Sequence, residues 1–368
     1  MSTSSTKWSP APVPRPIATE PSDPFGTHRA LEPLGALPQP AWRVDNDFSR
    51  LFPGEMLVAV ETLNIDAASF RQMEEAAGSL DGVKALVEKT VHDRGKQHNP
   101  VTGSGGMLLG RVLQLAPGRT DAGVVVGDRV ATLTSLSLTP LVLGATKDVR
   151  AASAQIDVEG EAVLFATGPF AKMPDDLSDR LALAVFDVAG AAPQVARLVK
   201  PGASVVVLGA GGKSGILCAA EARRAAGASG RVIGVESYEP YADDLRALGF
   251  CDEVVVADAR DPVAVRAAVL AANGGKEVDA TFSCVNVEGT EMSAILVTRD
   301  RGLVYFFAMS TSFTRAALGA EGVGKDVDLF IGNGFAHRHA EHSLQMLRDF
   351  PALRALFERR YDARNETP

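Results

Sequence analysis

The second half of the chain repeats one pattern: a short apolar run, then an alanine-rich stretch of helix-forming residues such as 216–227 or 262–275. The apolar runs do not alternate with polar residues, so each is predicted to be a strand covered on both faces, as in a parallel sheet. The pattern predicts a doubly wound α/β domain. Its expected strands are 203–209, 231–236, 252–258, 278–285, 302–309 and 326–332.

The first half of the chain is predicted to be mostly β. Apolar and β-branched runs at 55–64, 107–118 and 127–136 are each bounded by glycine or proline. A helical insertion is expected between the first two runs, with breaks at Gly78 and Gly82.

Length and charge limit the classes of protein that the chain can belong to. A chain of 368 residues exceeds the usual size of one core, so two domains are expected. The formal net charge of −8 argues against a surface for nucleic acid or anionic membrane, and no window suits a bilayer span. Three widely spaced cysteines suggest neither a disulfide framework nor a metal site, which fits a reducing cytoplasm.

A glycine-rich loop, VVVLGAGGKSG at 205–215, joins one predicted strand to the next helix. Its end, Gly212-Lys213-Ser214, resembles a triphosphate-binding loop, but that motif requires glycine at Val207. A dinucleotide site fits better because backbone N–H groups at a helix N-terminus can meet a pyrophosphate. The predicted contacts are Gly209, Gly211, Gly212, Lys213, Ser214 and Gly215, although the spacing GxGxxxG also suits an ordinary glycine turn.

The strand after this loop ends in Glu236, 21 positions beyond Gly215. An acidic residue there is placed to accept hydrogen bonds from the adenosine ribose hydroxyls. Its charge should repel a 2′-phosphate and so favours NAD over NADP. The neighbouring Ser237 and Tyr238 leave NADP possible.

The segment from MPDDLS at 173–178 through the glycine loop resembles the medium-chain dehydrogenase/reductase superfamily, as do GDRV at 127–130 and TFSCVN at 281–286. The resemblance implies a GroES-like β-rich catalytic domain at 25–171 and a Rossmann domain at 172–333. It further implies a disordered extension at 1–24 and a return of 334–368 to the catalytic domain. By position it adds these cofactor contacts: Cys284, Asn286, Ala308, Met309 and Ser310. A homodimer joined at the Rossmann sheet edge is also expected.

Zinc enzymes of this superfamily hold the metal with cysteine and histidine, and the matching positions here carry other residues. Asp66 replaces the first cysteine, Ser104 replaces the histidine, and Asp187 lies near the third ligand. The resemblance thus implies catalysis without metal, with these three as candidate catalytic residues. Each has a structural alternative: Asp66 as a turn residue, Ser104 as a small residue in a tight turn, and Asp187 as a helix N-cap.

Four longer motifs are similar to the L-erythro-3,5-diaminohexanoate dehydrogenase family: HRALEPLGALPQPAWRVDN, VETLNIDAASF, HNPVTGSGGMLLG and LGAEGVGKDVDLFIGNGF. The resemblance implies NAD(P)-dependent oxidative deamination of (3S,5S)-3,5-diaminohexanoate to 5-amino-3-oxohexanoate, with release of ammonia, in lysine fermentation. A carboxylate suits this chemistry because it can bind an ammonium and accept its proton.

Two other functions are compatible with the sequence. One is a zinc-independent quinone or enoyl reductase, and the other is a nucleotide-sensing protein without turnover. Glu61, Arg71, Lys96 and His98 lie near the motifs without an assigned role. His337, His339 and His342 suggest a metal, but their spacing favours the start of a helix at the domain junction.

Overall fold

The computed structural model describes residues 13–100, 103–119, 123–332 and 334–362. The chain divides into two compact units, Met1–Leu183 (unit 1) and Ala184–Pro368 (unit 2). The two units are described one at a time.

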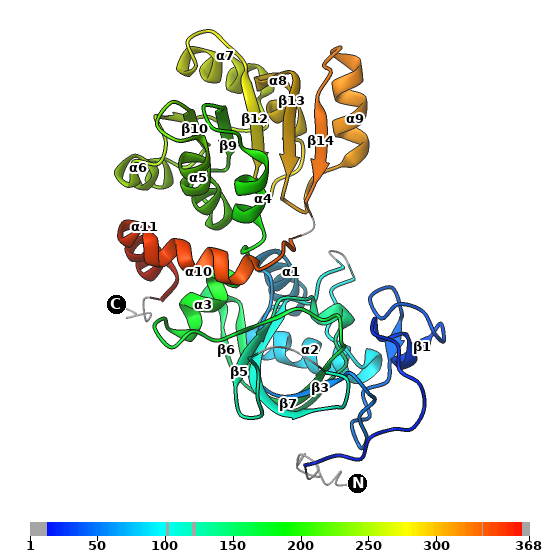
Figure 1. Cartoon of the computed structure of the whole chain (residues 1–368). Coiled ribbons are helices and arrows are strands. Elements are labelled where there is room, and N and C mark those ends of the chain that lie inside the picture. The colour runs from blue at the N-terminus through cyan, green and yellow to red at the C-terminus, as the bar shows by residue number, and fades with distance from the viewer. Residues whose placement is uncertain (1–12, 101–102, 120–122, 333, 363–368) are drawn as a thin grey trace. The chain divides into compact units, whose positions relative to one another are not determined.

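Unit 2 contains a parallel six-stranded sheet, shown from green to orange in Figure 1, with the strand order β11-β10-β9-β12-β13-β14. This order places the reversal of strand order between β9 and β12, as in doubly wound nucleotide-binding sheets. Each predicted strand of this unit is confirmed. The strands are β9 (Ser204–Leu208), β10 (Arg231–Glu236), β11 (Glu253–Val256), β12 (Val278–Ser283), β13 (Thr298–Phe306) and β14 (Asp328–Ile331).

Helices cover both faces of this sheet because its strands are apolar on both sides. Val206 and Leu208 of β9 pack in one core cluster with residues of α7, α8 and α9, which leaves the alternate residues Val205 and Val207 for the opposite face. There α5 lies against β9 and β10 (Figure 1). The helices are α4 (Ala191–Leu198), α5 (Lys213–Ala226), α6 (Glu239–Leu248), α7 (Pro262–Ala272), α8 (Glu291–Val297) and α9 (Phe313–Gly322).

The C-terminal segment packs within unit 2. Helix α10 (His339–Asp349) contacts α4, and α11 (Pro351–Phe357) contacts α6. Pro351 separates these two helices, because it is the first residue of α11. A π-helical turn, Glu358–Asp362 (η4), follows. The predicted return of 334–368 to the first domain stays a prediction, as do the other domain boundaries, and Asn333 lies outside the described residues.

Unit 1 is built on an antiparallel six-stranded sheet with the order β6-β7-β3-β4-β5-β8. The predicted strands β3, β4 and β5 are confirmed, whereas β6 and β7 were not predicted. The elements are β3 (Met56–Asn64), β4 (Met107–Leu115), β5 (Arg129–Thr132), β6 (Leu141–Arg150), β7 (Gln155–Leu164) and β8 (Phe170–Lys172), with 3-10 turns Leu136–Leu138 and Ala151–Ser153. Helix α3 (Asp179–Phe186) begins directly after Ser178, whose hydroxyl accepts from the Leu181 amide at 3.2 Å.

The helical insertion of unit 1 forms two helices, α1 (Ala67–Ala77) and α2 (Leu80–Arg94). The break predicted at Gly78 is confirmed, because this residue ends α1 with a left-handed φ of 67°. The break predicted at Gly82 is wrong. Ser79 caps α2 by accepting from the Gly82 amide at 3.1 Å, so Gly82 lies in the first turn of that helix.

Part of the predicted N-terminal extension is packed. The side chain of Arg15 is buried and forms an ion pair with Glu161 at 2.7 Å, and the Ala18 amide donates to the Leu51 carbonyl at 2.7 Å. A buried ion pair fixes the chain at this point, so disorder over 1–24 is wrong for Arg15 to Ala18. Residues 1–12 lie outside the described residues. The segment that follows holds a 3-10 turn, Thr27–Arg29, and the small sheet of β1 (Ala30–Glu32) and β2 (Arg43–Val44).

The predicted fold class is confirmed: an antiparallel, GroES-like β-rich unit and a Rossmann unit. Within the described residues, no single helix is long and apolar enough to cross a membrane.

Candidate functional site

In unit 2, the carboxyl ends of β9 and β12 meet at the point where strand order reverses. The Cys284 amide donates to the Leu208 carbonyl at 2.9 Å. Gly209 adopts a left-handed φ of 70°, and a Cβ added there would lie 2.9 Å from a methyl carbon of Val285. Ligands of open α/β sheets bind at such a crossing. The glycine loop and the residues after β12 therefore share one edge of the sheet.

The glycine loop forms a close crossing from strand to helix. A Cβ at residue 215 would lie 2.0 Å from the Gly209 carbonyl oxygen, and one at residue 211 would lie 2.6 Å from the Cβ of Tyr241. Gly212 begins α5 without a side-chain cap, and the first amides of a helix have no partner within it. Backbone N–H groups of Lys213, Ser214 and Gly215 therefore form a cradle that fits a pyrophosphate.

Glu236 ends β10 beneath this loop, and its side chain is buried. One carboxylate oxygen accepts from the Gly211 amide at 2.9 Å; the other accepts from the amides of Ser237 and Tyr238 at 2.9 and 3.1 Å. A carboxylate offers about four acceptor positions, so about one remains for a ribose hydroxyl. The fixed negative charge beside the loop fits an unphosphorylated ribose better than a 2′-phosphate.

The remaining predicted cofactor residues lie at the same edge of the sheet. The Phe307 amide donates to the Ser283 carbonyl at 2.9 Å, and the Ser310 hydroxyl donates to the Val285 carbonyl at 3.2 Å. The segment after β13, with Ala308, Met309 and Ser310, therefore lies beside the segment after β12, with Cys284 and Asn286. Met309 is 82% exposed.

Asp187 does not cap a helix. The N-cap of α4 is Gly190, and Asp187 instead forms an ion pair with Lys213 at 2.7 Å. Burial disfavours the charge of Lys213, but the attraction of Asp187 outweighs it and raises the pKa of the ammonium. This pair places a predicted catalytic residue of unit 2 directly beside the predicted pyrophosphate cradle.

Arg360, on the C-terminal turn, also contacts the loop, and nothing in the sequence singled it out. Its guanidinium donates to the Gly211 carbonyl at 2.7 Å and to Asp244 at 2.5 Å, and it stacks 3.9 Å above the Tyr241 ring. Next to it, the ring of Tyr361 lies 5.5 Å from the Lys213 ammonium. Arg360 and Gly211 are 149 residues apart in the chain, so the sequence gives no sign of this contact.

In unit 1, Asp66 and Ser104 flank the same end of the β3–β4 pair, where Asn64 pairs with Met107. Asp66 caps α1: one carboxylate oxygen accepts from the Ser69 amide at 2.8 Å, while the other is buried and has no hydrogen-bond partner within the described residues. The Ser104 hydroxyl accepts from the Gly106 amide at 3.3 Å. The predicted alternative for Asp66 was a turn residue, and its observed structural role is that of a helix N-cap, which uses one of its two carboxylate oxygens.

Two of the unassigned residues, Glu61 and Lys96, have structural partners. Glu61 pairs with Arg129 at 2.9 Å. Lys96 is fully buried and donates to the carbonyls of Pro38 and Gln39 at 2.5 and 2.9 Å, and burial lowers its pKa to about 8. Arg71 is exposed on α1.

His98, in contrast, has a buried ring nitrogen, Nδ1, that has no hydrogen-bond partner in the part of the chain that the structure describes. The neighbouring Gln97 likewise has an unpartnered side-chain oxygen and was not a predicted site residue. The sequence shows a polar pair at 97–98 after a helix, but it does not show that side-chain atoms of this pair are buried.

The three C-terminal histidines do not converge. His339 is the first residue of α10 and contacts the Ala336 carbonyl at 2.6 Å, whereas His342 pairs with Glu221 at 3.1 Å and His337 is exposed. The predicted helix start is confirmed. Among the described residues, no three His, Cys, Asp or Glu side chains are grouped to hold a metal. Independence from zinc stays a prediction.

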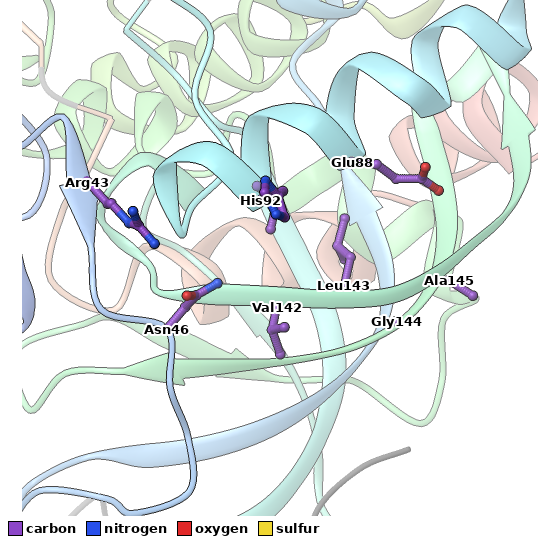
Figure 2. A pocket seen from close by; sticks show the side chains of 9 residues that line it. Arg43, Asn46, Glu88, His92, Val142, Leu143, Gly144 and Ala145 are labelled. Atoms are coloured by element: carbon purple, nitrogen blue, oxygen red, sulfur yellow. The ribbon is translucent and has the colours of Figure 1, made fainter. Parts of the chain in front are cut away.

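A hollow of about 550 Å³ lies on unit 1 between α2 and β6. Figure 2 shows Glu88 and His92 on the helix and Leu143 on the strand beside it. None of the predicted site residues lines it, so the hollow is separate from the sites above. Its lining is Arg43, Asn46, Glu88, Val91, His92, Val142, Leu143, Gly144 and Ala145.

Solved structures share the architecture of this chain. The Escherichia coli quinone oxidoreductase in complex with NADPH matches with a TM-score of 0.50 at 17% identity, over 82% of this chain and 80% of that one. At this identity the likeness shows the fold alone, a β-rich unit and a Rossmann unit.

Two curated relatives match almost end to end. The L-erythro-3,5-diaminohexanoate dehydrogenase of Acetoanaerobium sticklandii is 50% identical, and that of Fusobacterium nucleatum subsp. nucleatum is 48% identical. Each match covers 92% of this chain and 98% of the relative. A family model described as the L-erythro-3,5-diaminohexanoate dehydrogenase N-terminal domain matches residues 28–174. The chain therefore belongs to the L-erythro-3,5-diaminohexanoate dehydrogenase family.

Proposed function

We propose that this protein catalyses the NAD(P)-dependent oxidative deamination of (3S,5S)-3,5-diaminohexanoate to 5-amino-3-oxohexanoate, with release of ammonia. The observation that carries the proposal is the 50% identity to a relative of that name over 92% of the chain. The reaction converts an amine, water and oxidised cofactor into a ketone, an ammonium ion and reduced cofactor. We further propose that it belongs to lysine fermentation in the cytoplasm.

The residues of unit 2 suit a nicotinamide dinucleotide, which supplies the hydride acceptor when bound. The cradle of Gly211 to Gly215 would hold the pyrophosphate, and Glu236 the adenosine ribose. The backbone of Ala308 to Ser310 would meet the nicotinamide amide, with Cys284 and Asn286 beside its ribose. The carboxylate of Glu236 supports NAD as the preferred cofactor, with NADP as a second one.

In the proposed mechanism, the buried free oxygen of Asp66 binds the substrate ammonium and accepts its proton, because hydride leaves only from a neutral amine. The Ser104 hydroxyl orients the substrate. Asp187 is the second candidate carboxylate; its ion pair with Lys213 supports a role in fixing the residues at the cofactor cradle. The homodimer is also part of the proposal.

The test is the appearance of reduced nicotinamide when the purified protein meets (3S,5S)-3,5-diaminohexanoate and NAD or NADP, with ammonia assayed in parallel. Equal yields of reduced cofactor and ammonia are expected. A rate no higher than with simple alcohols, or turnover confined to quinones and enones, would remove this function.

A further inference from the structure

Unit 1 buries hydrogen-bond acceptors that have no partner. Of five such side-chain atoms among the described residues of the whole chain, three are in this unit: Asp66 Oδ2, Gln97 Oε1 and His98 Nδ1. An unsatisfied buried polar atom destabilises the folded protein, and native structures contain few of them. Three on one unit indicate a place where a ligand supplies the missing donors.

These residues belong to one region of unit 1. A Cβ at Gly105 would lie 2.4 Å from the Gln97 carbonyl oxygen, and one at the adjacent Gly106 would lie 2.7 Å from the Cα of Ile65, next to Asp66. The side-chain amide nitrogen of Gln97, Nε2, also lies 4.0 Å from the sulfur of Met73 on α1, the helix that Asp66 caps. Gln97 is 1% exposed.

The chemistry of the three atoms is that of acceptors. A carboxylate oxygen and an amide oxygen only accept. Burial, with the nearby charges of Arg94 and Lys96, lowers the pKa of His98 to about 4, so its ring is neutral and Nδ1 can accept. An ammonium carries three N–H donors, which matches three acceptors.

The nearby cations are already bound elsewhere and do not supply these donors. Arg94 donates to the Trp42 carbonyl at 3.0 Å and lies 4.2 Å from the centroid of the indole ring. Lys96 donates to two carbonyls, as described above. The unpartnered acceptors therefore remain available to a ligand.

We propose that Gln97 and His98 complete, with Asp66, a subsite for the substrate's reacting amino group and make the enzyme selective for amines over alcohols. This inference rests on the proposed function. The ammonium donates one N–H to each of the three residues. When one N–H bond breaks, its proton passes to Asp66 Oδ2, and the neutral amine keeps two N–H groups for Gln97 and His98. No electrons are transferred in this step.

Calorimetric titration of the whole protein without cofactor tests the subsite apart from turnover. The ligands are (3S,5S)-3,5-diaminohexanoate and two simple probes, sec-butylammonium and its neutral counterpart 2-butanol. The variants are Gln97→Met and His98→Phe, with Gln97→Glu as the conservative replacement. His92→Phe is the matched control, because His92 is an exposed histidine of the same unit with its side chain 88% exposed.

Loss of one hydrogen bond to a charged group weakens binding about tenfold or more. We expect this loss for both amines with Gln97→Met and His98→Phe, without a change for 2-butanol. Gln97→Glu should stay within about threefold of the wild type because it restores an acceptor, and His92→Phe should bind like the wild type. Equal affinity of all variants for amines, or equal loss of amine and alcohol binding, would overturn the subsite.

The melting temperature distinguishes a ligand-binding role of Gln97 from a structural one. Gln97→Met removes an unsatisfied acceptor, so its melting temperature should rise by about 2–4 °C. A structural glutamine would give a fall, which contradicts the proposal. If diaminohexanoate is not oxidised but amine binding still depends on Gln97, the subsite stands and the proposed function fails. If turnover is normal and Gln97→Met changes nothing, only the subsite fails.

Discussion

At the scale of single residues, Glu236 combines a structural role in the loop with a proposed role in cofactor choice, and a sequence motif does not distinguish the two. Its carboxylate accepts from three backbone amides, including that of Gly211. Its charge lies where we propose that the adenosine ribose binds. Replacement by alanine removes both effects together. Glu236→Gln keeps the size of the side chain and removes the charge, so it isolates the effect of charge on cofactor choice.

For Glu236→Gln we expect the ratio of kcat/KM with NADP to that with NAD to rise by about tenfold or more. Two unit charges 4 Å apart near a protein surface interact by about 4 kcal/mol, and tenfold corresponds to only about 1.4 kcal/mol. Steady-state kinetics with both cofactors provide the measurement. If the ratio is the same in Glu236→Gln, Glu236→Ala and wild type, Glu236 does not read the ribose.

His98 links stability to pH. Burial and the charges of Arg94 and Lys96 lower its pKa in the folded protein to about 4, against about 6.5 when unfolded. Between pH 4 and pH 6.5 the folded state therefore binds fewer protons than the unfolded state. The contribution of His98 to the free energy of unfolding is fully present above pH 6.5 and is lost as the pH falls to about 4. The loss is on the order of 3 kcal/mol.

Urea unfolding at pH 7 and at pH 5 measures this effect as a difference between proteins. His98→Phe should lose less stability than wild type between the two pH values, because it has no imidazole to protonate. Carboxylates that weaken at low pH contribute equally to both proteins. Parallel losses in the two proteins would show that His98 titrates normally.

At the scale of elements, the crossing from β9 to α5 depends on one close approach. Any side chain at Gly215 meets the Gly209 carbonyl, whereas a Cβ at Gly212 would be 3.5 Å from its nearest neighbour. Gly212 also has a φ of −73°, which alanine adopts easily. The two glycines of one loop therefore provide a matched pair.

Gly215→Ala should lower the free energy of unfolding by about 3 kcal/mol, because a methyl group cannot fit without moving the strand or the helix. Gly212→Ala should leave it unchanged or raise it by up to about 1 kcal/mol. Urea denaturation of both variants is the measurement. If both variants were equally stable, residue 215 would have more room than the 2.0 Å between its added Cβ and the Gly209 carbonyl oxygen implies.

The C-terminal turn supports the loop from outside. Arg360 is 9% exposed and bonds the Gly211 carbonyl, whereas its neighbour Arg359 is 61% exposed and contacts only Asp244 in the described chain. Arg360→Ala should raise the KM for the cofactor about tenfold with little change in kcat, since it loosens the binding loop. Arg359→Ala should change KM less than twofold, because an exposed ion pair contributes little. Equal KM values for both variants would show that the turn does not support the loop.

The elements of unit 2 were predictable because apolar runs and alanine-rich stretches reflect burial on both faces of its sheet. Unit 1 was harder. β6 has mostly half-buried and exposed residues, so its pattern has no continuous apolar run. Gly82 looks like a helix breaker, but the Ser79 cap places it in a first turn, where glycine is tolerated.

At the scale of the whole molecule, sequence motifs drew attention to the glycine loop and the Asp66 region but not to the distant residues that contact them. Glu236 and Gly211 come together because adjacent parallel strands end at one edge, which the pattern implies. The contact of Arg360 with Gly211 depends on how the C-terminal helices pack, and no local pattern encodes it. The burial of polar atoms of Gln97 and His98 was equally hidden, because burial of polar side chains follows from tertiary packing.

The proposed homodimer is expected to form at one of the two edges of the unit 2 sheet. β14 is one edge strand and has Ile331 63% exposed and Phe330 39% exposed; β11 is the other, with Val256 43% exposed. An edge strand with exposed apolar residues pairs readily with another chain. We therefore expect the proposed homodimer to join two copies through β14, so that the two sheets continue into one.

Ile331→Lys should convert the dimer to a monomer at micromolar concentration, because it places two like charges at the centre of the new strand pair. Val256→Lys makes the same change at the opposite edge and should leave the dimer intact. Sedimentation velocity of the wild type and both variants gives the masses directly. A monomeric wild type would remove the homodimer, and a dimer broken only by Val256→Lys would move the interface to β11.

Because the proposed cofactor cradle lies at the carboxyl ends of β9 and β12, away from both edges, the Ile331→Lys variant should still bind the dinucleotide.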